Sequence, residues 1–375
     1  MELIIKKLDK IRDAWNFSFL DYDFCRKHIN YSEEVATNYF GDIASYFDDT
    51  FPIISQSTFD DDRKEHLSSA IALLQAIYVQ QDLIDELMII FALPKSNSDF
   101  KEENRKLRNQ LVGHPISRDK TNKSLSSSVL FRYDNPTHEI TYVLYEASNG
   151  FKGSWRSISI SSIIDRHEKY LNKNFDIILK KIITILFKHR KELKRILKSL
   201  PKRIKFELLI EDVFTYFDKF SEFDYTYKRE RLLEYYQRRS EHTRYAYAIQ
   251  LFKQELKATL IEKIDSIKSF GKECDIHSTL PEIVSEIKIK FVSTGPYKGK
   301  KRRYKKDMSY EFGKLHQKDH PVGVDYFLER FGNWPTVGDE LRHMKTNIYN
   351  DTEYYASYNY LKKLLKGVHS TMFFE

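Results

Sequence analysis

Glycine is scarce in this chain, with only 12 glycines among 375 residues, about half of the usual frequency of roughly 7%. None of the glycine-rich signatures GxGxxG, GxxxxGK(S/T) or GxSxG occurs. These signatures need glycine to bring backbone N–H groups against a phosphate or to raise a nucleophilic serine on a strained turn. Their absence excludes the commonest dinucleotide-binding, P-loop and α/β-hydrolase classes.

Cysteine is rarer still, since only Cys25 and Cys274 occur and they form no CxxC pair. This excludes a disulfide framework and a cysteine-built zinc site, and it predicts a reducing, cytoplasmic compartment. Lys6 and Lys7 interrupt the N-terminal apolar run too early for a signal peptide, so none is expected. No uncharged apolar stretch approaches the roughly 18 residues of a membrane span, so we expect no membrane partner.

What the chain does contain is enough apolar surface for packed cores. Hydrophobic residues make up 41% of it, including 25 Tyr and 26 Phe, which excludes wholesale disorder. At roughly 100–200 residues per domain, the length predicts two domains. The 62 Lys and Arg exceed the 54 Asp and Glu by a net charge of +8. Nucleic acid is therefore a candidate partner, although a mean charge does not separate this from ordinary solubility.

Helical periodicity dominates the first half of the chain. Apolar residues recur at the i, i+3, i+4 spacing of an amphipathic helix over residues 67–91, and Pro94 ends that helix. Two runs rich in β-branched and aromatic residues flank an Asp-Asn-Pro turn and predict a β-hairpin over about residues 128–146. Residues 116–127 are polar and rich in serine and lysine, which predicts a loop. The other helices expected in this half cover residues 32–48, 100–112 and 159–197.

Pro201 is the clearest domain boundary in the sequence. The prediction is a mostly α protein with an N-terminal helical domain over residues 1–200, which carries the hairpin as an insertion, and a C-terminal helical domain over residues 201–375. A basic segment over residues 295–307, interrupted by glycine and proline, predicts a loop in the second domain. The helices expected in the second domain cover residues 206–220, 228–237, 242–270, 281–292 and 322–366.

The most informative segment reads Arg-Asn-Gln-Leu-Val-Gly-His-Pro from Arg108 to Pro115, at the end of a predicted helix. On an ideal helix six residues rotate by about 600°, so Arg108 and His114 would point about 120° apart. A left-handed Gly113 would end the helix just before His114 and let the imidazole turn back toward the arginine. We therefore predict that Gly113 adopts the left-handed conformation.

The pattern Arg108-Asn109 followed by His114 resembles the RNxxxxH signature of the HEPN superfamily (higher eukaryotes and prokaryotes nucleotide-binding domain), and the resemblance covers about residues 30–198. It implies an up-and-down helical bundle whose motif is the catalytic site of a metal-independent ribonuclease. It also implies a homodimer, in which two copies of the motif face one cleft as a composite active site. Stand-alone HEPN ribonucleases resemble toxins of toxin–antitoxin and abortive-infection systems, so the expected context is bacterial antiphage defence. Residues 201–375 would then be a regulatory domain that binds an antitoxin or sensor partner.

The implied chemistry needs no metal ion and no other cofactor. His114 is the candidate general base that takes the proton of the RNA 2′-OH, and a second histidine protonates the leaving 5′-oxygen. Arg108 neutralises charge on the phosphorane through its planar donor fork, and Asn109 orients Arg108 or the phosphate. The products would carry a 2′,3′-cyclic phosphate and a 5′-OH, and DNA, which lacks the 2′-OH, would be spared.

Two basic segments are candidate RNA-binding surfaces, because lysine and arginine neutralise the phosphates of nucleic acid. A basic run is equally typical of a solvated surface, and this alternative stays open. The candidate RNA-binding residues are Lys188, Arg190, Lys191, Lys194 and Arg195 near the end of the first domain, and Lys300, Arg302 and Arg303 in the basic loop.

Two other functions are compatible with the same sequence. In a non-catalytic HEPN-type module that binds RNA or assembles, Arg108 and His114 would be merely a cation at a helix C-terminus and a surface imidazole. A helical DNA-binding regulator is the second alternative. Gln81, at the edge of the apolar stripe of the preceding helix, is either a partner of the site or an ordinary polar residue.

Overall fold

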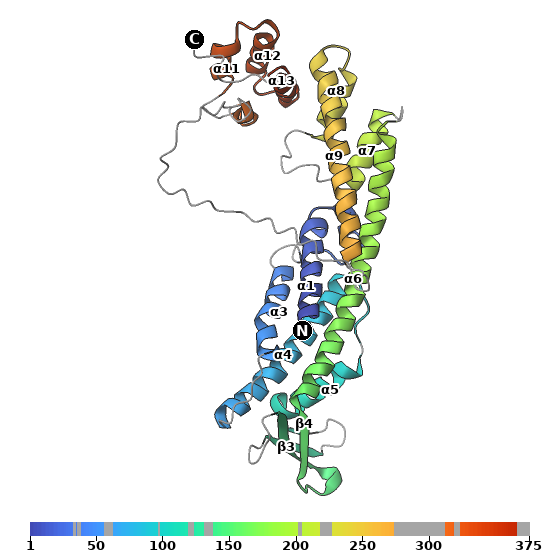
Figure 1. The fold of residues 1–375 in the computed structure, drawn as a ribbon, viewed down its shortest axis with the longest axis vertical. Helices are drawn as coiled ribbons and strands as arrows, with labels where there is room; N and C mark the ends of the chain where they lie inside the picture. Colours follow the sequence, from blue (N-terminus) through green and yellow to red (C-terminus); the bar gives the residue numbers. More distant parts are fainter. Residues whose placement is uncertain are drawn as a thin grey trace, which may run out of the picture. The chain divides into compact units, whose positions relative to one another are not determined.

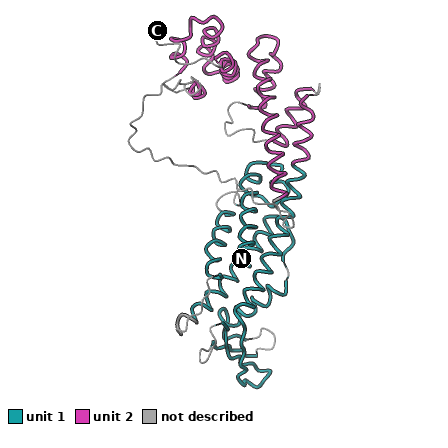
Figure 2. Tube along the Cα trace, in the orientation of Figure 1, with its two compact units in different colours: residues 1–189 teal, residues 190–375 magenta. Residues whose placement is uncertain are grey.

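The computed structural model describes residues 1–32, 35, 39–55, 63–96, 98–118, 124–130, 138–201, 205–217, 227–273, 312–318 and 323–365. The chain divides into two compact units, residues 1–189 and residues 190–375 (Figure 2). The protein is mostly helical, with one small antiparallel sheet in the first unit, which confirms the expected mostly α class. The boundary between the units falls within the long helix α6 (Ile160–Ser199) and not at Pro201.

Helices packed lengthwise against one another form the body of the first unit (Figure 1). Besides the first part of α6, they are α1 (Glu2–Ala14), α2 (Asp23–Arg26), α3 (Phe40–Ser55), α4 (Arg63–Ile90) and α5 (Asp99–Arg108). Helix α3 packs against α4, and α4 packs against α5. His167 of α6 contacts Gln80 of α4 through a 2.7 Å hydrogen bond in the buried interior. The sequence analysis predicted α4 and α6 close to their observed bounds, because both carry a continuous apolar stripe.

Helix α1 was not expected from the sequence, since the family resemblance begins only near residue 30. Its buried residues Ile4, Leu8 and Ile11 recur at the spacing of one helix face. Lys7 is also buried, and its ammonium group lies 2.5 Å from both the Asn172 side-chain oxygen and the Asp176 carboxylate of α6. A buried ammonium group needs such partners, so Lys7 holds α1 against α6.

A four-stranded antiparallel sheet follows α5. Its strands, in spatial as well as chain order, are β1 (Ile116–Arg118), β2 (Leu125–Leu130), β3 (Glu139–Glu146) and β4 (Ser154–Ser159). The hairpin expected over residues 128–146 corresponds to the β2–β3 pair, in which Val129 lies opposite Val143. Its turn, residues 131–137, lies outside the described residues. The loop prediction over residues 116–127 is wrong at both ends, because these two ends pair with each other as β1 and the start of β2. The start of β2 also pairs with β3, which has the stronger β propensity.

One face of the sheet shares a hydrophobic core with the helices. Ile140 of β3 belongs to the same buried cluster as Leu107 of α5, Leu74 of α4 and Ile163 of α6. Tyr142 and other partly buried residues of the sheet pack against this cluster. The sheet is thus anchored directly on the helix that carries the arginine of the RNxxxxH motif.

The second unit is helical in all of its described elements. They are the end of α6, α7 (Phe206–Tyr216), α8 (Arg229–Gln237), α9 (Thr243–Glu273), a 3-10 turn (Lys314–His316), α11 (Val324–Phe331), α12 (Pro335–Thr346) and α13 (Asp351–Leu364). Helices α7, α8 and α9 confirm three of the expected helices. The region expected to be helical over residues 322–366 resolves into α11, α12 and α13. The helix expected over 281–292 and the basic loop over 295–307 lie outside the described residues.

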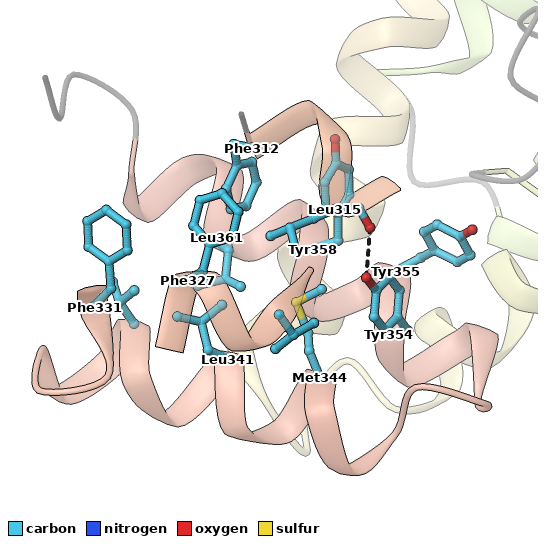
Figure 3. Packing of buried hydrophobic residues seen from close by; sticks show 12 residues of the cluster. Phe312, Leu315, Phe327, Phe331, Leu341, Met344, Tyr354, Tyr355, Tyr358 and Leu361 are labelled. Atoms are coloured by element: carbon cyan, nitrogen blue, oxygen red, sulfur yellow. Dashed lines mark hydrogen bonds between the residues drawn. The ribbon is translucent and has the colours of Figure 1, made fainter. Parts of the chain in front are cut away.

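A compact aromatic core joins α11, α12, α13 and the 3-10 turn (Figure 3). The Tyr354 hydroxyl donates a 2.7 Å hydrogen bond to the backbone carbonyl of Leu315. Phe312 stacks on Tyr358 with ring centroids 5.4 Å apart.

Over the part of the chain that the structure describes, no helix has both the length and the apolar character needed to cross a bilayer.

Candidate active site

Helix α5, which carries the arginine of the motif, is tied to α4 by a ladder of polar contacts. Lys101 is buried and its ammonium group lies against the Asp85 carboxylate. One turn further on, Arg105 pairs with Asp82. The partners descend along α4 as the residues ascend along α5, so the two helices run antiparallel. The ladder fixes the height and rotation of α5 and therefore the direction in which Arg108 leaves it.

The Arg108 guanidinium is held by three hydrogen bonds and one aromatic ring. Gln75 of α4 accepts from both Nε and Nη2 through its side-chain oxygen, at 3.1 and 3.0 Å. The side-chain oxygen of Asn109 accepts from Nη1 at 3.0 Å, and Cζ lies 4.2 Å from the centre of the Tyr78 ring. These bonds use three of the five N–H donors of the guanidinium. One N–H on each terminal nitrogen is left without a partner among the described residues, and this pair can serve two oxygens of one phosphate.

Gly113 does not adopt the expected left-handed conformation, because Gly150 is the only glycine with positive φ among the described residues. Instead, residues Asn109–Gly113 form a π-helical turn, closed by a 2.6 Å bond from the His114 N–H to the Asn109 carbonyl. Such a turn takes one more residue than an α turn, and it is frequent at functional sites. The left-handed cap was expected because glycine usually supplies it, but this helix ends in a π-helical turn instead.

Glycine at residue 113 leaves room for the Arg108 guanidinium in its observed position. A methyl group added to Gly113 would lie 2.6 Å from Nη1 and 3.3 Å from Cζ of Arg108, well inside van der Waals contact. The π turn brings the Cα of residue 113 under the guanidinium, and the missing side chain leaves room for it. Arg108 therefore lies over the residue that immediately precedes His114, so the motif's cation and the backbone of its imidazole are brought together.

His114 is exposed, and its backbone is held from both sides. On the far side, the Ser128 N–H of β2 donates to the Pro115 carbonyl at 2.7 Å. On the near side, the Ser128 hydroxyl donates to the Gln110 carbonyl of the π turn at 2.8 Å. The imidazole is thus presented to solvent from a rigid backbone. This combination suits a group that must exchange protons with a ligand.

The candidate RNA-binding residues of α6 fall into two groups. Lys188, Lys191 and Lys194 are exposed and spaced along one side of the helix. Arg195 is instead committed to an ion pair, with two 2.9 Å bonds to Asp212 of α7. Hydrogen bonds from the guanidinium, to Asp212 first and then to Glu192, raise its pKa further above the usual range. Arg195 thus links α6 to α7.

The remaining candidate RNA-binding residues contribute less to a described surface. Arg190 is half-buried, and its Nε donates a 3.2 Å bond to the Ile264 carbonyl of α9. Lys300, Arg302 and Arg303 lie outside the described residues, as does the rest of their loop. Of the described candidate RNA-binding residues, Lys188, Lys191 and Lys194 are therefore the ones that present exposed ammonium groups.

Gln75 and Tyr78, the two residues of α4 that hold Arg108, were not predicted from the sequence. Gln81 was the candidate partner, but its side-chain oxygen accepts from Arg105 at 3.1 Å. A signal was present, because two aspartates on α4 face a lysine and an arginine in reversed order on α5, as an antiparallel pair requires. Extending that register by one turn leads from Arg108 to Tyr78, and Gln75 lies one further turn along the same side of α4.

Comparison of the chain with known protein families, with curated proteins and with solved structures found no match in any of the three. Within the part of the chain that the structure describes, histidine, cysteine, aspartate and glutamate form no group of three or more that could hold a metal ion. The geometry of the arginine, the glycine and the histidine therefore carries the functional argument alone.

Proposed function

We propose that this protein is a metal-independent endoribonuclease whose catalytic residues are Arg108, Asn109 and His114. The observation that carries the proposal is the Arg108 guanidinium, fixed by Gln75, Asn109 and Tyr78 while two of its five N–H donors have no partner among the described residues. The guanidinium also lies over Gly113, the residue that precedes the exposed His114. The arrangement suits a phosphate bound between the two side chains.

RNA supplies its own nucleophile, so the protein needs to supply only proton transfer and charge stabilisation. His114 takes the proton of the 2′-OH as that oxygen attacks the adjacent phosphorus. Arg108 donates its two remaining N–H groups to the non-bridging oxygens, whose charge grows in the phosphorane. The bond to the 5′-oxygen then breaks, which leaves a 2′,3′-cyclic phosphate and a 5′-OH.

The leaving 5′-oxygen needs a proton, and one chain offers a single motif histidine. The second histidine is proposed to come from another copy of the chain, in the homodimer with a composite active site that the HEPN resemblance implies. Such an enzyme would act as a toxin-like effector of bacterial antiphage defence in the cytoplasm. The second unit, with its separate aromatic core, would be the regulatory part that binds an antitoxin or a sensor.

The direct test is cleavage of total RNA by the full chain in the presence of EDTA. We expect cleavage at undiminished rate, with a 2′,3′-cyclic phosphate on each upstream product. An oligonucleotide with a single 2′-deoxy residue at the cleaved position should resist. If RNA is bound but stays intact, the non-catalytic RNA-binding module is the better description, and the exposed lysines Lys188, Lys191 and Lys194 favour it. Preferential binding of duplex DNA would favour the DNA-binding regulator.

The Gly113→Ala substitution is expected to reduce cleavage by roughly tenfold or more without destabilising the protein. The new methyl group would displace the Arg108 guanidinium from its position against Gln75, and misplacing a catalytic group costs up to about a hundredfold in rate. Folding should not suffer, since alanine in a helix is favoured over glycine by about 0.5–1 kcal/mol. Thermal denaturation and cleavage rates measure the two effects.

Gly41 offers the matched control, because it also lies in a helix and a methyl group there meets nothing within 4 Å. Gly41→Ala should leave cleavage unchanged. Equal cleavage by the Gly113→Ala variant and by wild type would show that the position of the guanidinium is unimportant.

A further inference from the structure

The face of the sheet that points away from the helices exposes large apolar side chains. Residues paired across antiparallel strands point to the same face, which places Val129, Val143 and Trp155 together. Val143 is buried there, whereas Val129 and Trp155 are exposed. Trp155 is 66% exposed and Ile116 of β1 is 75% exposed. We call this the outer face and define it by Ile116, Leu125, Val129 and Trp155. Exposed apolar residues gathered on one face typically mark an interaction site.

The outer face is attached rigidly to the candidate active site. Strand β1 begins two residues after His114, and Ile116 pairs with Ser127 of β2. The next residue, Ser128, bonds to the π turn and to Pro115. From β1 to β4 there are three interstrand steps, about 14 Å in all, which equals the length of about four stacked nucleotides. A strand of RNA cleaved at His114 can therefore reach Trp155 within a few nucleotides.

The polar residues around Trp155 suit a nucleic acid better than an apolar protein surface. Thr141 and Ser157 lie on the same face and contact each other at 3.1 Å. Arg118 is exposed at the β1 end of the face, and it can neutralise a phosphate. Tyr145 also lies on this face, as does Glu139, whose carboxylate accepts from the Ser157 hydroxyl. Aromatic rings and small hydroxyl side chains, with a cation along the path, are the composition of a base-stacking surface on a sheet.

We infer that the outer face stacks the unpaired bases of single-stranded RNA within about four nucleotides of the cleaved phosphate, with Trp155 as the principal stacking residue. This inference rests on the proposed function and specifies its substrate: an RNA whose bases beside the cleavage site are unpaired. The sheet thereby selects the substrate, while the motif cleaves it. Figure 1 shows β3 and β4 at the end of the first unit, beyond its helices.

Tryptophan fluorescence tests the inference independently of cleavage. Trp15 is buried and Trp334 is half-buried, so Trp155 is the tryptophan most accessible to a ligand. Titration of the full chain with a single-stranded 2′-O-methyl oligonucleotide of about ten residues, which cannot be cleaved by its own 2′-oxygen, should quench the emission. Trp155→Phe should retain binding but lose most of the quenching. Trp155→Ala should weaken binding roughly tenfold.

Cleavage kinetics provide the second measurement. With single-stranded RNA, Trp155→Ala should raise KM roughly tenfold and leave kcat unchanged. With a dinucleotide, which is too short to reach β4, the variant should equal wild type. Tyr349→Ala is the matched control, because it removes an aromatic residue that is 99% exposed in the second unit. It should change neither affinity nor KM.

The possible failures are distinguishable. Quenching by the oligonucleotide without cleavage of ordinary RNA would refute the proposed ribonuclease and retain the stacking surface. Cleavage without quenching, and with unchanged affinity in Trp155→Ala, would refute the stacking surface and retain the ribonuclease. An emission change that depends on protein concentration and occurs without RNA would show that a second copy covers the outer face, which would also refute it.

Discussion

Replacement of His114 by alanine is expected to lower the rate of RNA cleavage by about 10²–10⁴-fold, the usual contribution of a general acid or base. In a composite site the fall in rate should lie at the upper end of this range, because the substitution removes both the histidine that accepts the first proton and the histidine that donates the second. The fold should be unaffected, since His114 is exposed, and neither its own backbone bond to Asn109 nor the bond between Pro115 and Ser128 requires an imidazole. A surface substitution of this kind changes the free energy of unfolding by no more than about 0.5 kcal/mol.

Cleavage of a labelled single-stranded RNA by purified wild type and variant, in EDTA, measures this effect. His138, which is also exposed, provides a control substitution at the residue immediately before β3. Cleavage by the His114→Ala protein at the wild-type rate would eliminate the proposed mechanism. If two chains share one site, a mixture of His114→Ala and Arg108→Ala proteins should recover part of the activity.

The Arg108→Lys substitution complements this experiment, because it keeps the positive charge and removes the planar guanidinium with its paired N–H donors. An ammonium group cannot bond Gln75 and still offer two parallel donors to a phosphate. We expect the rate of RNA cleavage to fall about 10²-fold or more. Removal of one hydrogen-bond donor to a transition-state oxyanion has an effect of this size. Retention of activity by the lysine variant would indicate that charge alone matters.

Replacement of Glu353 by alanine is expected to destabilise the second unit by about 3–5 kcal/mol, the cost of removing one partner of a buried ion pair. Glu353 of α13 is only 5% exposed. The Tyr245 hydroxyl of α9 lies 2.9 and 2.7 Å from the two oxygens of its carboxylate and donates its one proton to them, and His343 of α12 donates a bond at 2.8 Å. The carboxylate also pairs with Arg238, which follows α8. A single carboxylate thus joins the α8–α9 hairpin to α12 and α13.

The same carboxylate predicts a pH dependence. Burial alone would raise the pKa of Glu353, but the hydrogen bonds from Tyr245, His343 and Arg238 outweigh it and lower the pKa below its usual value. A folded-state pKa below that of the unfolded chain stabilises the fold above the unfolded value, near 4.5, and this stabilisation is lost as the pH falls through the folded value. The wild-type protein should therefore lose stability below about pH 4.5 more steeply than Glu353→Gln.

Urea denaturation of the full chain, followed by circular dichroism, measures both effects. Glu329→Ala is the matched control, since Glu329 is an exposed glutamate on α11 of the same unit. It should change the free energy of unfolding by less than about 0.5 kcal/mol. A Glu353→Ala protein as stable as the control would show that the network around this carboxylate contributes nothing net to folding.

Several elements of the fold were predictable because their signal is local. Helices α4 and α6 carry apolar stripes, and Pro94 and the glycine and proline near the motif mark where helices end. The first and last strands of the sheet were not predictable. Ile116–Arg118 and Ser154–Ser159 are short and polar, and they are strands only because β2 and β3 lie beside them.

The candidate site divides in the same way. Arg108, Asn109 and His114 were identified from residue type and spacing, and the position of the motif at a helix end was correct. The predicted geometry of that helix end was wrong. The same residues can form an α turn or a π turn, since the two differ only in which carbonyl accepts from each N–H. The need for Gly113 also has a different cause, namely the approach of the arginine rather than a left-handed backbone.

The sequence by itself determined the helical class, the groups available for chemistry and the exclusion of glycine-loop and cysteine-based functions, since these depend on composition and on neighbours along the chain. Only the tertiary structure decided which residue holds the arginine and where the exposed tryptophan lies. Gln75 is 33 residues from Arg108 in the chain, and Trp155 reaches the outer face through the pairing of four strands. Contacts of this kind depend on the register between distant segments, which is set by the burial of their shared core and not by any local pattern.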